Sequence, residues 1–156
     1  MKIEEVRGIP DYAEILELIN AEWPIEFGEK TEQEQIRHMQ EHHNPETDIV
    51  KYLLEDGDVV GFYRYSRWPR AHPHSRTAHL LDIAVLPSQQ GRGLGRKLMT
   101  ELTRDCSEKG IEKLFSRTCE TNRRSIGLHR SFGFTEYKTT DDSIVWQLTV
   151  ATSELR

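Results

Sequence analysis

A glycine-rich hexapeptide, Gln90-Gly91-Arg92-Gly93-Leu94-Gly95, lies between a predicted strand and a predicted helix. The strand covers residues 77–86 and ends at Pro87, because proline has no N–H group to donate to a neighbouring strand. The helix that follows is predicted from four side chains at four-residue intervals, and Lys109 and Gly110 close it. These side chains are Leu94, Leu98, Leu102 and Cys106.

Three glycines at the point where a strand becomes a helix favour the binding of an anion. None of them carries a Cβ atom, so an anion can come close and the backbone N–H groups can point at it. The first turn of the helix adds unpaired N–H donors and the positive end of the helix dipole. Arg92, Arg96 and Lys97 add full positive charges. We therefore interpret the loop as a pyrophosphate cradle.

Two other phosphate-binding loops fit these residues less well. A P-loop ends in Gly-Lys-Ser/Thr, whereas Gly95 is followed by Arg96 and Lys97. A dinucleotide-binding fingerprint would need glycine at position 96 and normally follows the first strand of its unit, whereas this loop comes after about half of the chain. Taken alone, the hexapeptide also fits a tight turn before a solvated, basic helix start.

Length and composition indicate one soluble globular domain, 1–156, with a frayed tail at 151–156. The chain has 36% hydrophobic and 30% charged residues among its 156, which is typical of a modest core. The net charge of −5 argues against nucleic acid as a partner, since the basic residues are only locally clustered. Two cysteines form no disulfide framework, and we see no signal peptide and no long apolar run. We therefore expect a cytoplasmic protein without a membrane partner.

The remaining hydrophobic patterns predict an α+β domain. Helices begin at Pro10 and Thr31, and a short helix runs from an Asn122 cap to Phe132, with Gly133 after it. An Asp56-Gly57 pair predicts a tight hairpin between two strands. The further strands are predicted at 2–7, 49–55, 59–67, 111–119, 134–139 and 143–150. The order of elements is therefore β-α-α-β-β-β-α-β-α-β-β.

This order and two motifs resemble the GCN5-related N-acetyltransferase (GNAT) family over nearly the whole chain. The family pattern Arg/Gln-x-x-Gly-x-Gly/Ala is met at 90–95, after a matching strand at 81–87. A second pattern, Asn-x-x-Ala-x-x-x-Tyr and then Gly-Phe, is represented by Asn122, Ser125, His129 and Gly133-Phe134. Serine thus replaces the usual alanine, and histidine replaces the usual tyrosine. The resemblance implies a mixed, mostly antiparallel sheet of about seven strands, flanked by four helices, with strands 4 and 5 splayed apart.

The resemblance also implies an activity, the transfer of the acetyl group of acetyl-CoA to a primary amine by direct attack on the thioester. Acetyl-CoA would be the co-substrate, and no metal is expected. Its pyrophosphate would lie on residues 90–96, and its pantetheine arm would pair with the backbone of strand 4 like an added strand. The implied cofactor-binding residues are Ile83, Ala84, Val85, Gln90, Gly91, Arg92, Gly93, Leu94, Gly95, Arg96 and Asn122.

Three residues are candidates for moving protons in this reaction. His79, predicted on the same strand face as Ile83 and Val85, would be largely neutral at pH 7 and could act as the base. Asp82 faces the other side of a regular strand and would turn inward only at a bulge. His129 stands at the tyrosine position and would be the acid for the departing thiolate, with activity falling as pH rises through its pKa. Both histidines could instead only pack.

The acceptor amine stays open, as either a small molecule or a protein amine. The expected substrate-binding residues are Trp23, Glu26, Phe27 and Trp68. His38 and His42 share a helix face but have no third ligand, so we favour a polar surface over a metal site. A homodimer is left open. Two alternatives remain for the function, a catalytically weak acyl-CoA-binding regulatory module and, less favoured by the acidic balance, a nucleic-acid-binding module.

Overall fold

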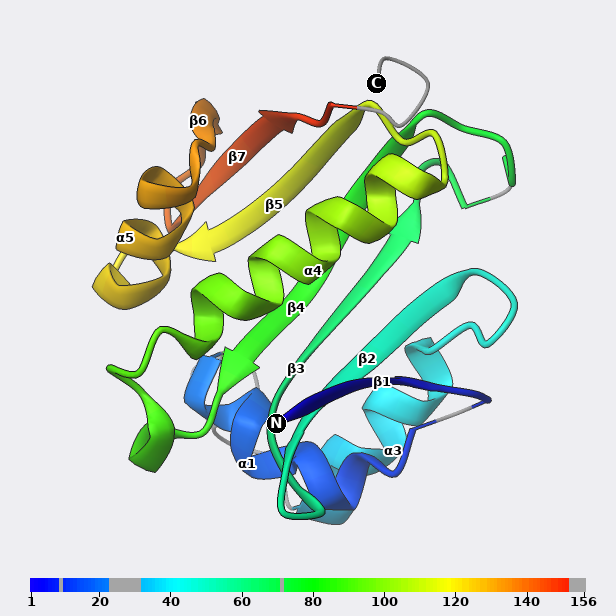
Figure 1. Cartoon of the computed structure of the whole chain (residues 1–156), viewed down its shortest axis with the longest axis vertical. Coiled ribbons are helices and arrows are strands. Elements are labelled where there is room, and N and C mark those ends of the chain that lie inside the picture. Colours follow the sequence, from blue (N-terminus) through cyan, green and yellow to red (C-terminus); the bar gives the residue numbers. More distant parts are fainter. Residues whose placement is uncertain (9, 23–31, 71, 152–156) are drawn as a thin grey trace.

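The computed structural model of the chain describes residues 1–8, 10–22, 32–70 and 72–151, which form one seven-stranded sheet (Figure 1). The strand order is β1-β2-β3-β4-β5-β7-β6, and only the β4–β5 pair is parallel. The strands are β1 (Lys2–Val6), β2 (Asp48–Glu55), β3 (Asp58–Arg67), β4 (Thr77–Val85), β5 (Lys113–Cys119), β6 (Thr135–Thr139) and β7 (Ser143–Thr149). The described helices are α1 (Tyr12–Glu22), α3 (Glu32–His42), α4 (Leu94–Glu108) and α5 (Arg123–Phe132), with a 3-10 turn, η1, at Pro87–Gln89.

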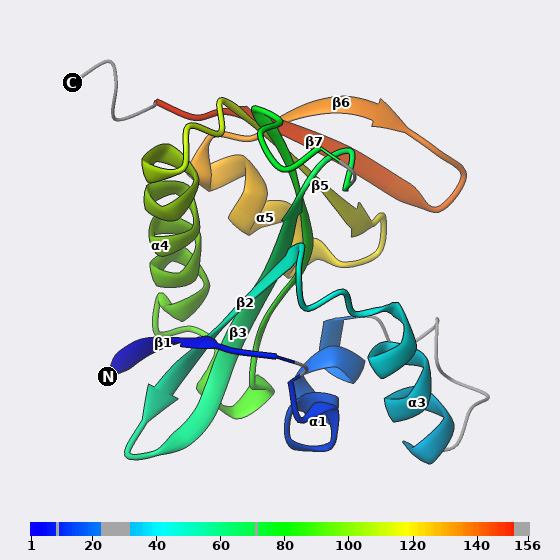
Figure 2. The same cartoon turned by 90° about the vertical axis from the view of Figure 1, so that its right-hand side faces the viewer.

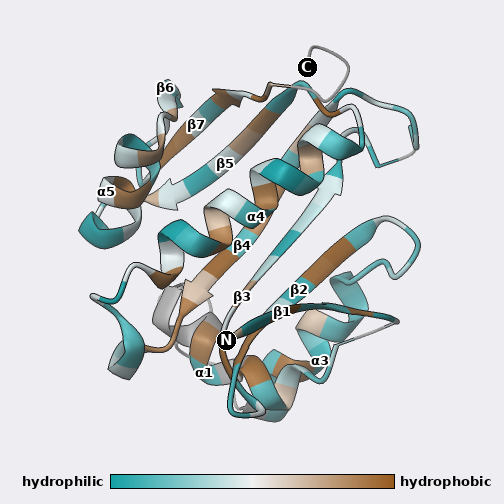
Figure 3. Cartoon of the chain, in the orientation of Figure 1, coloured by the Kyte–Doolittle hydropathy of each residue, from teal (hydrophilic) through white to brown (hydrophobic). Residues whose placement is uncertain are grey.

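Helices cover both faces of the sheet, α1 and α3 on one side and α4 and α5 on the other (Figure 2). The larger core lies between α4 and the strands, and a smaller one lies under α1 and α3. The predicted apolar face of α4 is confirmed, because all four of its side chains are buried. Figure 3 shows the resulting alternation of polar and apolar bands along α4. The predicted mixed sheet with flanking helices is therefore confirmed.

Short sequence patterns correctly predicted the β2–β3 hairpin and the two ends of α5. Asp56 and Gly57 both have positive φ angles, 53° and 84°, as a two-residue type I′ hairpin between β2 and β3 requires. The Asn122 side chain accepts a hydrogen bond of 3.1 Å from the N–H of Ser125 and so caps α5. Gly133 ends that helix in the left-handed conformation, at φ 107°.

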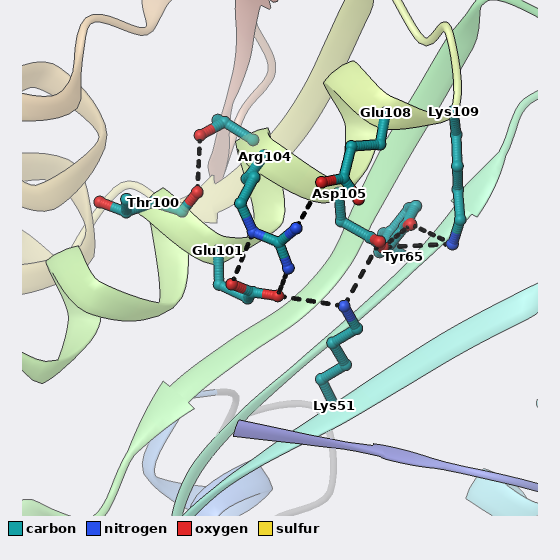
Figure 4. Close-up of polar contacts among 9 residues, drawn as sticks. Lys51, Tyr65, Thr100, Glu101, Arg104, Asp105, Glu108 and Lys109 are labelled. Atoms are coloured by element: carbon teal, nitrogen blue, oxygen red, sulfur yellow. Dashed lines mark hydrogen bonds and ion pairs between the residues drawn. The ribbon is translucent and has the colours of Figure 1, made fainter. Parts of the chain in front are cut away.

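A polar cluster fixes the C-terminal half of α4 on β2 and β3 (Figure 4). The ammonium group of Lys51 lies 3.2 Å from Glu101 and 3.3 Å from Asp105. Tyr65 donates its hydroxyl hydrogen to Asp105, and Lys109 donates to the Tyr65 oxygen at 3.0 Å. Burial would raise the pKa of Asp105, but the Tyr65 hydrogen bond and the two lysines outweigh it and hold that pKa below its usual range. The Asp105 carboxylate therefore keeps its negative charge, and with it the cluster keeps its geometry.

The predicted splay of strands 4 and 5 is confirmed by the short pairing between β4 and β5. Their ladder runs from Thr77 opposite Lys113 to Leu80 opposite Ser116 and stops there. Beyond that point β4 stays paired with β3, and β5 stays paired with β7. One backbone edge of residues 81–85 is therefore left without a strand partner.

Because of a bulge in β4, His79 lies on a different face of the sheet from the one predicted. Arg64 lies opposite Asp82 while Tyr65 lies opposite Leu80, so β4 carries one extra residue here. An extra residue reverses the alternation of side chains, because that alternation has a period of two. The prediction that His79 shares a face with Ile83 and Val85 is therefore wrong. His79 lies on the face of α1 and α3, as do Asp82 and Ala84.

Two predictions at the ends of elements fall on residues that the structure does not describe. These are the Thr31 cap of the second helix and the frayed tail, of which only Ala151 is described. Among the described helices, each is too short or too polar to cross a membrane.

We predict that Leu102→Ala lowers the free energy of unfolding by about 2–5 kcal/mol, because it leaves a cavity at a completely buried position of α4. Urea unfolding followed by circular dichroism measures the change. Lys97→Ala is the matched control, since Lys97 is exposed on the same helix, and its effect should stay within about 0.5 kcal/mol. Equal effects of the two substitutions would contradict the assignment of the buried face.

Candidate active site

A cavity of about 320 Å³ lies at the end of β4, beside the first turn of α4 and one face of α5. Of the cofactor-binding residues predicted from the sequence, all except Arg92 line it. Three further lining residues, Arg124, Ser125 and Leu128, were not predicted as site residues. Helix spacing could have identified Ser125 and Leu128, since residues three positions apart share a helix face: Ser125 follows Asn122 by three positions, and Leu128 follows Ser125 by three. The structure thus brings the two sequence motifs together around one cavity.

The glycine loop presents backbone donors at the start of α4. Gly91 and Gly93 have φ angles of 86° and 77°, a conformation in which other residues are strained. Gly93 is the N-cap residue and provides no side-chain cap. The first backbone bond of the helix runs from Lys97 N–H to Gly93 C=O at 3.1 Å, so the preceding N–H groups have no acceptor inside the helix. Together with the helix dipole, these donors suit an anion.

Gly95 has a different role, because its backbone is helical. A Cβ atom at this position would lie 3.1 Å from a methyl group of Leu128, so glycine allows α4 and α5 to approach closely. Arg92 turns away from the cavity, and its guanidinium forms an ion pair of 2.9 Å with Glu55. That hydrogen-bonded pair holds the pKa of Glu55 below its usual value. The Arg92 side chain therefore ties the loop to the β2–β3 hairpin instead of lining the cavity.

A second, much smaller cavity lies at the splay of the sheet. Its lining comes from β4, β5 and α5 and is formed by Leu80, Leu81, Asp82, Ile83, Ser116, Arg117 and His129. Ile83 lines both cavities, which therefore lie next to each other. Two of the predicted catalytic residues, Asp82 and His129, therefore meet here, whereas His79 lines neither cavity.

His129 is held as a neutral ring, which runs against the predicted role of a protonated acid. Its Nδ1 lies 2.7 Å from the carbonyl oxygen of Ser125, and a carbonyl only accepts, so Nδ1 carries the hydrogen. Nε2 then accepts from the Ser116 hydroxyl at 2.8 Å. Burial lowers the pKa of His129 to about 4. At neutral pH the ring has no proton to give in the way we expected, and activity should not fall through a His129 titration near pH 6.5.

His79 keeps the property that a base needs, although it lies on the other face of β4. Burial, and then the positive charges of Arg117 and Arg70, lower its pKa below 6.5, so the ring is neutral at pH 7. Its buried Nδ1 has no hydrogen-bond partner among the described residues. The ring of Trp68 lies 5.9 Å away and is about half exposed.

Asp82 belongs to a buried ion-pair network under α1 and α3. One of its oxygens lies 2.7 Å from Nε of Arg64, and Arg64 also lies 3.8 Å from Asp48. Asp48 in turn lies 3.3 Å from Arg70 and 3.8 Å from the His43 ring. The Asp82 carboxylate is therefore engaged by a guanidinium, which makes it less available than His79 for a substrate proton.

The other predicted site residues are only partly placed. Trp23, Glu26 and Phe27 lie outside the described residues, whereas Trp68 lies beside His79. His38 and His42 stack with ring centroids 4.1 Å apart. Within the described ranges, no group of three or more histidine, cysteine, aspartate or glutamate side chains is arranged to hold a metal ion.

Comparisons with known proteins agree with this architecture. A sequence profile described as the Acetyltransferase (GNAT) family matches residues 12–134. The mycothiol acetyltransferase of Thermomonospora curvata is 33% identical over 87 residues, 55% of this chain and 28% of that protein. The N-alpha-acetyltransferase RimI of Mycobacterium tuberculosis is 40% identical over 78 residues, 50% of this chain and 46% of that protein. The matched region thus spans less than half of each of these relatives.

Among solved structures, the fold is similar to that of the PaiA N-acetyltransferase from Thermoplasma acidophilum, crystallised in complex with coenzyme A. The TM-score is 0.71, and the match covers 96% of this chain and 99% of that one. Sequence identity is 16%, so this likeness concerns the fold.

We predict that His129 makes the stability of the protein fall as pH falls between about 6.5 and 4. The folded protein keeps the ring neutral down to about pH 4, whereas the unfolded chain takes up a proton near pH 6.5. Unfolding therefore binds a proton in this window, and this group alone lowers stability by about 1.4 kcal/mol per pH unit. Urea unfolding of wild type and His129→Gln over this range measures the effect, and the variant should show the shallower dependence.

His42→Gln serves as the control, because His42 is exposed on α3. His43 and His79 also have lowered pKa values, but they contribute equally to both proteins in each comparison. If wild type and His129→Gln lost stability in parallel with falling pH, the buried neutral state of His129 would be refuted.

Proposed function

This chain belongs to the acetyltransferase (GNAT) family, and on that basis we propose that it transfers the acetyl group of acetyl-CoA to a primary amine. The observation that carries the proposal is the larger cavity at the end of β4, where two recognition surfaces meet. The start of α4 offers N–H groups to a pyrophosphate, and the unpaired edge of β4 offers backbone groups to an extended pantetheine arm.

The residues around the cavity fit acetyl-CoA in charge and in hydrogen-bonding capacity. Arg96 and Arg124 provide positive charge beside the glycine loop. The Asn122 oxygen is used in capping α5, which leaves its amide N–H groups for the pantetheine arm. The hydroxyl of Ser125 is buried without a hydrogen-bond partner among the described residues, so it is available as a further donor. We propose no metal.

Acetyl-CoA supplies an acyl group activated as a thioester, which a neutral amine can attack directly. As the new C–N bond forms, the C–S bond of the thioester breaks, and CoA leaves as a thiolate that takes its proton from water. The attacking amine loses one proton, and we assign the acceptance of this proton to His79 because its ring is neutral and lies on the face opposite α4 and α5. Asp82 or a water molecule is the alternative base. For His129 we propose a positioning role, because its bonds to Ser116 and Ser125 hold α5 against β5.

We also propose the domain organisation, the cellular location and the partners of this protein. Residues 1–156 make a single acetyltransferase domain of the cytoplasm, with no nucleic-acid or membrane partner. One sheet runs through all the described strands, and both cysteines are free, which supports this view. The two relatives carry different names, a mycothiol acetyltransferase and an N-alpha-acetyltransferase, so they do not point to one common acceptor. A weakly catalytic acyl-CoA-binding module is distinguished by measuring CoA release with a panel of amines.

We predict that Gly93→Asp abolishes acetyl-CoA binding, because it adds a negative charge where the pyrophosphate is proposed to lie. Calorimetry with acetyl-CoA measures the loss. Gly110→Asp is the matched control, since Gly110 also has a positive φ, 74°, and open space around it, but lies at the other end of α4. Equal affinities of wild type and Gly93→Asp would show that the cradle is wrongly assigned.

We predict that His79→Ala lowers turnover by roughly 10²-fold or more, the usual scale for losing a general base. The fall of kcat/KM toward low pH that comes from this imidazole should disappear, while acetyl-CoA affinity by calorimetry stays within about two-fold. A pH profile identical to that of wild type would transfer the role to Asp82 or to water.

A further inference from the structure

The charges around the splay leave one guanidinium without a carboxylate. Arg64 and Arg70 are balanced by Asp48 and Asp82, through the ion pairs described above. Arg117 is different, because its side chain makes no hydrogen bond or ion pair with any described residue. These three arginines and two aspartates together carry one surplus positive charge. The surplus charge belongs to Arg117, which lines the smaller cavity.

Arg117 lies at the position where the two strands separate. It directly follows Ser116, which forms the last β4–β5 pair with Leu80. Ile83 lines both this cavity and the proposed acetyl-CoA site, so the two cavities lie next to each other. Arg117 lies two residues after Phe115, the β5 partner of His79, and residues two apart on a strand share a face. Arg117 and His79 therefore lie on the same face of neighbouring strands. A group bound by Arg117 would therefore lie beside both the thioester and the proposed base.

An exposed row of aromatic side chains crosses the same face of the sheet. Trp68 contacts His79, His79 is the strand neighbour of Phe115, and Phe115 contacts Tyr137 with ring centroids 5.3 Å apart. Trp68 is 49% and Tyr137 56% exposed, unusual values for large aromatic residues. No described helix covers β5, β7 and β6 on the side of α1 and α3 (Figure 2). We call Trp68, His79, Phe115 and Tyr137 the aromatic row.

We propose that the acceptor is a free α-amino acid with an aromatic side chain, whose carboxylate binds Arg117 and whose ring packs on the aromatic row. The inference rests on the proposed acetyl transfer and adds the class of the acceptor. Guanidinium and carboxylate form two parallel charge-assisted hydrogen bonds, which fix orientation as well as position. In an α-amino acid the amine is two bonds from the carboxylate, so a carboxylate held at the splay also holds the nucleophile there.

The kinetic test compares L-phenylalanine with L-phenylalaninamide, in which an uncharged carboxamide replaces the carboxylate. CoA release is measured for wild type, Arg117→Gln and Lys113→Gln. Lys113 is exposed on the same face of β5 but four residues earlier, so it controls for general loss of positive charge. We expect Arg117→Gln to raise the KM for L-phenylalanine at least ten-fold, with the amide unaffected and Lys113→Gln equal to wild type. Comparing variants on one substrate cancels the different basicities of the two amines.

A binding measurement gives a readout that does not depend on turnover. L-phenylalanine is titrated by calorimetry into protein saturated with CoA, which has no acetyl group to transfer. Binding should weaken at least ten-fold in Arg117→Gln and also in Trp68→Ala, and L-alanine should bind weakly to all variants. Undetectable binding of L-phenylalanine to the wild type, or equal binding to wild type and Arg117→Gln, overturns the inference.

The outcomes separate this inference from the proposed function. If amines are acetylated but L-phenylalanine has no advantage that Arg117→Gln removes, acetyl transfer stands and the acceptor class is wrong. A peptide with N-terminal phenylalanine that outperforms the free amino acid also overturns the acceptor class, because its carboxylate is remote. If L-phenylalanine binds through Arg117 but no amine is acetylated, the acceptor site stands and the transferase proposal fails.

Discussion

The β4–β5 ladder stops at Leu80 and Ser116, and the rest of the site follows from that interruption. Backbone N–H and C=O groups away from a partner have to bind water or a ligand, since leaving them unpaired costs free energy. Here the unpaired edge of β4 meets the start of α4, whose first N–H groups also lack partners. The fold therefore collects unsatisfied backbone groups in one place, where an extended molecule with an anionic end can satisfy them.

Keeping such a gap open requires that the two parts of the sheet are held by something other than strand pairing. α4 holds the β1–β4 part of the sheet, because its buried face packs along the strands and its Asp105 cluster fixes it to β2 and β3. α5 holds the part that contains β5 and β7, through the His129 ring between Ser116, Phe134 and Trp146. The two helices then approach closely where Gly95 meets Leu128. Rigid supports therefore surround an unpaired edge.

The bulge in β4 decides which side chains face the acceptor. By adding one residue, it places Asp82 and His79 on the same side of the sheet while Ile83 stays beside the α4 core. Asp82 is paired there with Arg64, whereas Arg117 on the neighbouring strand has no carboxylate partner in the part of the chain that the structure describes. The side on which we propose the acceptor thus combines a neutral imidazole, one surplus cation and exposed aromatic rings. The donor side, by contrast, is built mainly from backbone groups.

The order of the elements, the Asp56-Gly57 hairpin and the glycine loop were determined by the sequence alone. Each depends on short-range physics, such as the period of apolar residues or the positive φ that glycine accepts at positions 91 and 93. Most of the predicted cofactor residues also line one cavity, because they lie at the end of β4, at the start of α4 and at the cap of α5, which the fold brings together.

Only the tertiary structure decided the chemistry of the side chains. The extra residue in β4 is visible solely in its pairing with β3, so periodicity placed His79 on the wrong face. The neutral state of His129 depends on Ser116 and on burial against Trp146, which come from β5 and β7. Arg92 pairs with Glu55 of the neighbouring hairpin, and Arg117 has no side-chain partner among the described residues, for the same reason. Charge, protonation and orientation depend on partners distant in the chain, and a single sequence does not encode their distances locally.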